Sequence, residues 1–211
     1  MRTTQSYRAP GALVVLVGLV VLVSSLASCA SGASVTVTAR LPPERPRRGP
    51  ERIMGGTSVG EARLAAFFAE SNPSKDRAKV ARLAALYVEE SSLEGVNPDV
   101  AFAQMCLETG FLRFGGLVTE EMNNFCGLGS IGPGQAGNAF PDERTGVRAH
   151  VQHLKAYASA EPIRGELVDP RYRYVTPKGK APTIHGLGGT WASDREYGEK
   201  LAGLIDRIYA R

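Results

Sequence analysis

Apolar side chains recur at helical spacing through most of the chain beyond residue 59. Between Leu64 and Phe68 they fall three and four residues apart, and a second stripe runs from Val80 to Val88. Such spacing places the apolar side chains on one face of an amphipathic helix. The same pattern returns from about residue 145 to 160, and again from about Ser193 towards the C-terminus. The pattern therefore predicts several helices that pack through their apolar faces.

A further helix is expected directly after Asn97. An Asn side chain suits the N-cap of a helix, and Pro98 suits the first helical position, where a missing N–H costs nothing. The following residues are nearly all apolar as far as Glu108, and Gly110 is placed to end the helix. We therefore expect an apolar helix that carries one carboxylate near its C-terminal end.

Two long segments lack the helical pattern. Residues 115–143 hold seven glycines and few strong helix formers, and a second loop runs from residue 161 to 190. Long irregular segments inside compact domains are usually functional. Because strands and helices do not alternate and no internal repeat occurs, we expect an all-α domain with a small irregular or hairpin lobe.

The first residues of the chain are typical of an export signal. Arg2 and Arg8 precede an apolar run over residues 12–23, which is too short to span a bilayer comfortably. The run Leu26-Ala-Ser-Cys29 then resembles the cleavage box of bacterial lipoproteins, in which the cysteine is lipidated. We expect residues 1–28 to be a lipoprotein signal peptide and Cys29 to anchor the protein to a membrane of the cell envelope, on its periplasmic or extracytoplasmic side. The alternative is an ordinary secretion signal with an incidental cysteine.

Residues 29–57 have the composition of a tether. Four prolines and five arginines gather between residues 40 and 52, and such a sequence is expected to stay extended and not to build a core. We therefore place the folded domain at residues 58–211.

Charge, cysteines and histidines narrow the function only a little. A formal net charge of +4 does not imply nucleic acid as a partner. Cys106 and Cys126 form either a disulfide or two buried free thiols, and the sequence does not decide between them. His150 and His153 stand three apart, without the accompanying ligands that metalloproteases use. We expect no metal and no cofactor.

Glu108 is the first candidate for chemistry. Its apolar helix would partly desolvate the carboxyl group, and the negative end of the helix dipole lies nearby. Both effects raise the pKa of a carboxylic acid. An acid that is still protonated near neutral pH can donate its proton to a glycosidic oxygen. The alternative is a solvated glutamate at a helix end.

Four motifs in order extend this interpretation. They are Ala103-Gln-Met-Cys-Leu-Glu-Thr-Gly110, Asn123-Asn-Phe-Cys-Gly-Leu128, Gly146-Val-Arg-Ala-His-Val-Gln-His-Leu154 and Trp191-Ala-Ser-Asp-Arg-Glu-Tyr197. Together they resemble the endo-β-N-acetylglucosaminidases of bacterial wall hydrolases, glycoside hydrolase family 73, over about residues 57 to 211. One departure is that Phe125 follows Asn124 directly, where the family usually has one more residue.

This resemblance implies a lysozyme-like fold and a substrate. The family cleaves the glycan strand of peptidoglycan after N-acetylglucosamine, with Glu108 in the position of the general acid. For the second catalytic group the resemblance and spacing indicate Asp142 or Glu143, in the loop before a helix. Either residue has the alternative of stabilising a helix N-terminus. The substrate's own N-acetyl group is the third possibility.

Further residues resemble parts of a binding cleft. Tyr197 resembles a late tyrosine whose hydroxyl lies near the scissile bond, or it packs in the last helix. Asn123 and Asn124 would bind acetamido groups of the sugar, or stabilise a turn. Trp191 would stack on a sugar face, or anchor the core.

Three functions fit these observations. The first is a peptidoglycan hydrolase, and the second is a lytic transglycosylase, which needs only one acid. The third is a non-catalytic lipoprotein that binds the cell wall. Because no coiled-coil heptad occurs, we expect a monomer.

Overall fold

The computed structural model describes residues 48–57, 59–130, 132 and 134–210. The predicted signal peptide at residues 1–28, Cys29 and most of the predicted tether lie outside the described residues. Within the described part of the chain, no helix is both long and apolar enough to cross a membrane.

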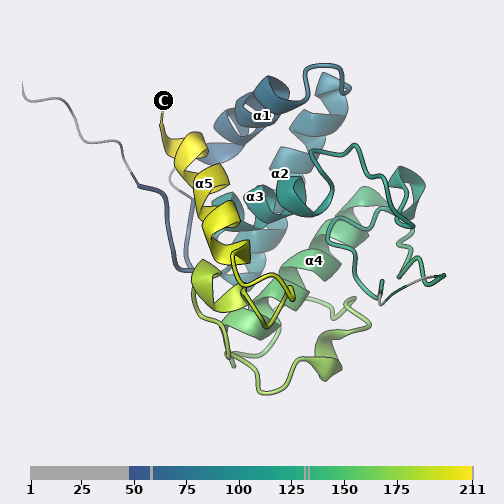
Figure 1. Cartoon of the computed structure of the whole chain (residues 1–211), viewed down its shortest axis with the longest axis vertical. Coiled ribbons are helices and arrows are strands. Elements are labelled where there is room, and N and C mark those ends of the chain that lie inside the picture. The colour runs from purple at the N-terminus through teal and green to yellow at the C-terminus, as the bar shows by residue number, and fades with distance from the viewer. Residues whose placement is uncertain (1–47, 58, 131, 133, 211) are drawn as a thin grey trace, which may run out of the picture. The chain divides into compact units, whose positions relative to one another are not determined.

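Helices dominate the described residues, as the sequence predicted. Strand pairing there is limited to isolated bridges, of which one, Gly132 to Gln135, lies in the glycine-rich segment. That segment forms a small irregular lobe, drawn in teal at the right of Figure 1. The helical elements are α1 (Gly60–Ser71), α2 (Arg77–Glu94), α3 (Pro98–Glu108), η1 (Glu120–Met122), α4 (Glu143–Ala158), η2 (Tyr172–Tyr174), η3 (Ile184–Leu187) and α5 (Tyr197–Tyr209).

Local sequence signals explain where the helices begin and end. The side chain of Asn97 accepts a hydrogen bond from the backbone N–H of Asp99 at the start of α3, as predicted. Gly95 ends α2 in the left-handed conformation, which costs little without a Cβ. Helix α4 begins two residues before the predicted position. Helix α5 begins at Tyr197, four residues after the predicted start at about Ser193.

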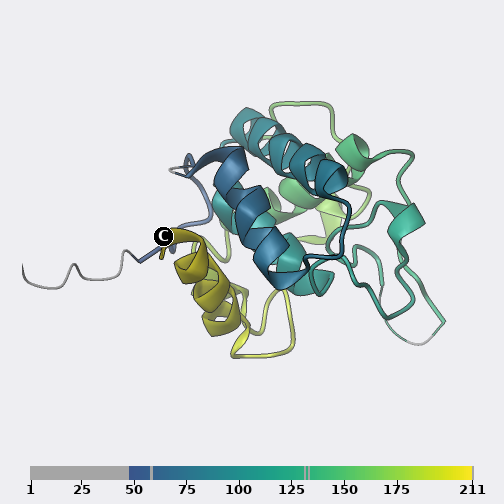
Figure 2. The same ribbon diagram turned by 90° about the horizontal axis from the view of Figure 1, so that it is seen from above.

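Helix α3 is the centre of the core. Every residue from Pro98 to Cys106 is buried, and the helix packs against α1, α2, α4 and α5. Figure 1 shows α3 between α5 and α2, and α1 lies beside α2 in both views (Figures 1 and 2). The rings of Phe68 and Tyr87 pack edge-on against Phe102 of α3. An almost entirely apolar helix is thus covered on most sides, which removes it from water.

The tether predicted for residues 29–57 ends earlier than residue 57. Ile53 is fully buried in the core, and its backbone N–H donates to the carbonyl of Pro182. Arg52 and Met54 form bridges with Thr183 and Val96. Residues 49–57 therefore belong to the folded domain. In the sequence, Ile53 and Met54 stand among prolines, arginines and glycines, so the composition of the segment did not indicate that it is anchored to the core.

A buried ion pair fixes the loop after α4. Lys155 of α4 and Glu94 of α2 are fully buried, with 2.9 Å between Nζ and Oε2. The backbone N–H groups of Arg164 and Gly165 also donate to Glu94. A buried charge needs such compensation to avoid a large desolvation cost. The pair therefore joins α2, α4 and the following loop at one point.

Gly146 lets α4 approach the irregular lobe. A Cβ at this position would lie 1.8 Å from the backbone carbonyl oxygen of Asn123. Asn123 itself is held in the left-handed conformation, and its side-chain amide donates to the carbonyl of Phe140. The glycine in the third motif is therefore required by packing between a helix and a backbone.

We expect Gly146→Ala to destabilise the fold by about 1–3 kcal/mol, because the methyl group meets backbone that has to move. The matched control is Gly203→Ala in α5, where a Cβ meets no atom within 4 Å. That change should stabilise the helix by about 0.5–1 kcal/mol. Urea unfolding of both variants measures the difference. A Gly146→Ala variant at least as stable as the unaltered chain would contradict the packing argument.

Candidate active site

Glu108 is the last residue of α3, and the chain reverses immediately after it. Gly110, Phe111 and Leu112 follow with φ values of 58°, 58° and 56°. Left-handed backbone is unfavourable for non-glycine residues, so this turn needs support from its surroundings. Glu108 therefore stands directly before an abrupt turn of the backbone.

Contacts with α1 and the segment after it supply that support. Asn72 Nδ2 donates to the carbonyl of Phe111 at 2.8 Å. The Phe111 ring packs against Phe67 and Phe68, with ring centroids 5.6 Å apart in both pairs. The backbone N–H of Phe111 donates to the carbonyl of Cys106 and closes the end of α3. Core packing thus holds the strained turn and fixes the position of Glu108.

One oxygen of the Glu108 carboxyl group receives two hydrogen bonds. Trp191 Nε1 donates to Oε1 at 2.8 Å, and the Tyr197 hydroxyl donates to the same oxygen at 2.5 Å. Trp191 comes from the loop after η3, and Tyr197 is the first residue of α5. Because an indole N–H can only donate, Oε1 is occupied as an acceptor. A proton on this carboxyl group therefore belongs on Oε2.

The surroundings of Glu108 favour its protonated form. Burial raises the pKa of the carboxyl group, while the hydrogen bonds from Tyr197 and Trp191 act in the opposite direction and only partly offset it. One side of Glu108 is still exposed. The protein therefore removes much of the water around the carboxyl group but leaves the group accessible. The arrangement suits an acid that must hold a proton and present it to a substrate.

Trp191 is packed on its other faces by aromatic side chains. Its ring centroid lies 5.3 Å from that of His153 and 5.2 Å from that of Tyr157. His153 Nδ1 in turn lies 2.8 Å from Oδ2 of the buried Asp169. These contacts hold the indole in one orientation. Trp191 therefore packs among aromatic side chains, which corresponds to the core-anchoring alternative, and also donates to Glu108, which the sequence did not indicate.

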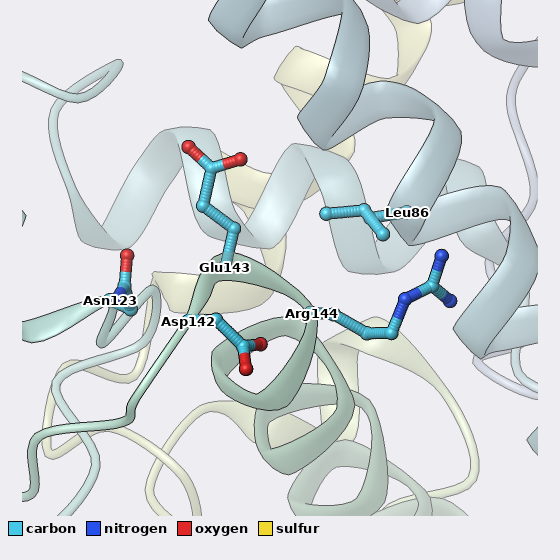
Figure 3. Close-up of a pocket in the computed structure, with 5 residues that line it drawn as sticks. All are labelled: Leu86, Asn123, Asp142, Glu143 and Arg144. Carbon is cyan, nitrogen blue, oxygen red and sulfur yellow. The ribbon is translucent and has the colours of Figure 1, made fainter.

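Asp142, Glu143 and Asn123 line a different place. They surround an open depression of about 570 Å³ together with Leu86 and Arg144, and Glu108 is not among its lining residues (Figure 3). In Figure 3 the carboxyl groups of Asp142 and Glu143 point in opposite directions. The structure therefore brings Tyr197 and Trp191 into hydrogen-bond contact with Glu108, whereas the two loop acids line a depression that Glu108 does not line.

Both loop acids have structural partners. Asp142 caps α4 by accepting from the backbone N–H of Thr145, and this hydrogen bond lowers the pKa of its carboxyl group. Glu143 lies 3.5 Å from Lys79 and 3.4 Å from Arg82. The Asp142 contact corresponds to the helix-stabilising alternative that the sequence offered, whereas Glu143 is paired with two cations of α2.

Asn124 lies inside the irregular lobe. Its side chain is fully buried and bonds the backbone of Leu128 and Asn138. All of these hydrogen bonds hold the loop between residues 124 and 138. The geometry corresponds to the turn-stabilising alternative for Asn124, while Asn123 is half-buried at the rim of the depression.

The two cysteines and the two histidines are accounted for by burial and by hydrogen bonds. Cys106 and Cys126 are free and buried, and burial raises the pKa of both thiols well above the usual value. Among the described residues, no group of three metal-ligating side chains occurs. His150 and His153 have separate partners, because His150 bonds Tyr87 and Gln104 while His153 bonds Asp169.

Sequence reasoning missed the polar residues behind Tyr197. Gln104 Nε2 donates to the Tyr197 hydroxyl at 2.9 Å, and Gln104 Oε1 lies 3.1 Å from His150. The one available signal was a glutamine among apolar residues in α3, one helical turn before Glu108. A polar side chain there has to find partners inside the core.

The raised pKa of Glu108 has a consequence for stability. The folded state holds the proton more tightly than the unfolded state, so ionisation costs stability above the folded pKa and costs nothing below the usual value of 4.5. We expect Glu108→Gln to be more stable than the unaltered chain at about pH 7, and the difference to vanish towards about pH 4. Urea unfolding at both pH values tests this, and a variant less stable at neutral pH would show that the carboxyl group is not desolvated.

Comparisons with known proteins agree with this site. The sequence matches the Glucosaminidase family, described as mannosyl-glycoprotein endo-beta-N-acetylglucosaminidase, over residues 84–210. An uncharacterised protein of Borreliella burgdorferi is 45% identical over 142 residues, which cover 67% of this chain and 69% of that protein.

Two solved structures show a weaker likeness. S. aureus autolysin E in complex with a muropeptide has 15% identity and a TM-score of 0.44, over 75% of this chain and 70% of that chain. The catalytic domain of the autolysin Auto from Listeria monocytogenes has 17% identity and a TM-score of 0.40, over 69% of this chain and 84% of that chain. The family match does not depend on them, and it spans well over half of the chain, from α2 through Glu108 to Tyr197 and the end of α5. The chain therefore belongs to the Glucosaminidase family of glycosidases.

Proposed function

We propose that this protein is a peptidoglycan hydrolase that cleaves the glycan strand after N-acetylglucosamine, with Glu108 as the general acid. The observation that carries the proposal is the exposed carboxyl group with a raised pKa, bound by Tyr197 and Trp191 at one oxygen only. The family match supplies the type of sugar, and the ordered motifs supply the polymer. We also propose that the enzyme is a monomer, held on the extracytoplasmic side of a membrane by a lipid on Cys29.

In the proposed first step, Glu108 transfers its proton from Oε2 to the glycosidic oxygen. The bond between that oxygen and the anomeric carbon breaks, and the leaving sugar departs with a new hydroxyl group. The negative charge that develops on Glu108 is stabilised by the donors already aimed at Oε1. Such preorganised donors need no rearrangement when the charge appears.

We propose that the N-acetyl group of the substrate completes the reaction. Its carbonyl oxygen forms a bond to the anomeric carbon as the leaving group departs, which gives a cyclic cationic intermediate. Water then attacks the anomeric carbon, the bond to the acetamido oxygen breaks, and the Glu108 carboxylate takes the proton from that water. This route needs one carboxyl group from the protein, and the contacts of Asp142 and Glu143 support it, because both acids are engaged in holding α4.

A lytic transglycosylase is the second candidate, because it also needs one acid. In that reaction a hydroxyl group of muramic acid replaces water and forms an anhydro end. One observation favours this candidate. Among the described residues, Glu108 is the one carboxylate that Tyr197 and Trp191 bind. The products distinguish the two reactions.

We expect Glu108→Gln to lower kcat/KM on peptidoglycan by at least about 100-fold, because an amide has no proton to donate. The purified full-length chain is incubated with peptidoglycan, and mass spectrometry identifies the new ends. New reducing N-acetylglucosamine ends support the proposed function, and anhydro-muramic ends indicate the transglycosylase instead.

Glu61→Gln, an exposed substitution in the first turn of α1, is the matched control and should leave the rate unchanged. Binding to peptidoglycan without any cleavage would indicate the wall-binding alternative. Cleavage that survives Glu108→Gln would refute the assigned acid.

A pair of variants tests the role of Asp142. Because Asn caps a helix as well as Asp does, Asp142→Asn should keep both activity and stability, whereas Asp142→Ala should lose about 1 kcal/mol of stability. If Asp142 were the catalytic base, both variants would lose activity. Parallel measurements of urea unfolding and peptidoglycan cleavage decide between these outcomes.

A further inference from the structure

A chain of hydrogen bonds runs through the core and ends at Glu108. The Tyr87 hydroxyl lies 2.8 Å from His150 Nδ1, and His150 Nε2 lies 3.1 Å from Gln104 Oε1. Gln104 Nε2 lies 2.9 Å from the Tyr197 hydroxyl, which donates to Glu108. Four helices contribute one link each before the acid is reached, namely α2, α4, α3 and α5.

The direction of every hydrogen bond in this series follows from the orientation of the Gln104 amide. The Gln104 amide presents its N–H group to Tyr197, so its carbonyl oxygen faces His150. A carbonyl oxygen can only accept, so His150 Nε2 has to carry a hydrogen. In a neutral imidazole Nδ1 then has none, and it accepts from the Tyr87 hydroxyl. Each donor therefore points towards Glu108.

The surroundings keep these hydrogen-bonded residues uncharged. Tyr87, Gln104 and His150 are fully buried, and burial lowers the pKa of His150 to about 3, so its ring is neutral. Three titratable groups face these hydrogen-bonded residues, namely Cys106 of α3, Cys126 of the irregular lobe and His153 of α4. His153 in turn bonds Asp169. Burial raises the pKa of both thiols and of the Tyr87 hydroxyl, so all three keep their protons.

We propose that Gln104 and His150 are positioning residues that keep the Tyr197 hydroxyl donating to Oε1 of Glu108, and so keep the catalytic proton on Oε2. The proposal rests on the proposed function of Glu108 as the general acid. A tyrosine hydroxyl can rotate, and a glutamine amide can flip and offer its oxygen instead. With a flipped amide, Tyr197 would donate to Gln104 and leave Oε1 free to take the proton. As long as His150 carries its hydrogen on Nε2, that N–H requires an acceptor and opposes the flip.

This series of hydrogen bonds does more than satisfy polar groups in the core. Hydrogen bonds in series polarise one another, so the N–H of Gln104 makes Tyr197 a stronger donor to Glu108. A stronger donor favours the ionised carboxylate that remains after proton transfer. The buried glutamine thus influences the acid without touching it, and a residue with only a structural role would not.

The first test observes His150 in the unaltered, full-length chain and needs no substrate. Nitrogen-15 NMR of labelled histidine should show one ring that carries its hydrogen on Nε2 and does not titrate between about pH 5 and 8. A hydrogen on Nδ1 of His150 itself, or titration of the His150 ring in this range, would overturn the proposal. This outcome is independent of whether the protein cleaves peptidoglycan.

The second test measures the pKa of Glu108 in a matched pair of variants. Gln104→Met removes the donor to Tyr197, so the ionised form of Glu108 loses stabilisation and its pKa should rise further, by about half a unit. Gln152→Met is the control, since Gln152 is an equally buried glutamine whose hydrogen bonds go to Glu94 and the backbone of the loop after α4. Carboxyl carbon-13 NMR titration follows Glu108, which is assigned by the signal lost in Glu108→Gln.

The rate should follow the same shift. Because the general acid is inactive once ionised, the alkaline limb of kcat/KM should move to higher pH in Gln104→Met and stay in place in Gln152→Met. Equal shifts in both variants, or a shift in neither, would mean that Gln104 only stabilises the core. Should Gln104→Met fail to fold, Tyr87→Phe removes the far end of the chain, and the same titration should show a smaller shift in the same direction.

Discussion

The burial of α3 is the constraint on which the other features of the site depend. Four other helices pack around α3, and its apolar residues explain why it is central. Its last residue is a glutamate, whose carboxyl group has to reach the surface. A left-handed turn follows directly after Glu108 and ends the helix there, and contacts from Asn72, Phe67 and Phe68 hold the turn. The desolvation that makes Glu108 an acid and the packing that stabilises the fold therefore have one origin.

Such a core has no obvious place for polar side chains, yet it holds Tyr87, Gln104 and His150. Buried polar groups are costly unless they are satisfied, and each of these is satisfied by the next. Apolar side chains of similar volume would pack at least as well. What the polar side chains add is a fixed orientation at Tyr197, the residue that binds the acid. Stability and orientation are thus served by different residues of the same core.

The sequence predicted what depends on local pattern. The stripe of α2, the Asn97 and Pro98 start of α3, and the irregular lobe all follow from neighbours along the chain. The hydrogen bonds of the site do not, because Gln104 and Tyr197 are 93 residues apart, and Trp191 and Glu108 are 83 apart. Their pairing depends on how α3, α4 and α5 pack, which spacing alone does not fix. The same holds for Ile53, whose backbone bonds Pro182 and Asn97, both far along the chain.

Two carboxylates with similar prospects in the sequence acquire opposite properties in the fold. Asp142 precedes a helix, where backbone N–H groups stabilise its charge and lower its pKa. Glu108 ends a helix inside the core, where burial raises its pKa. A carboxylate already stabilised by a cap is a poor base, since its affinity for a proton is reduced. The fold therefore gives these two residues opposite affinities for a proton, which is the physical basis for proposing Glu108 as the proton donor and the substrate's N-acetyl group as the nucleophile.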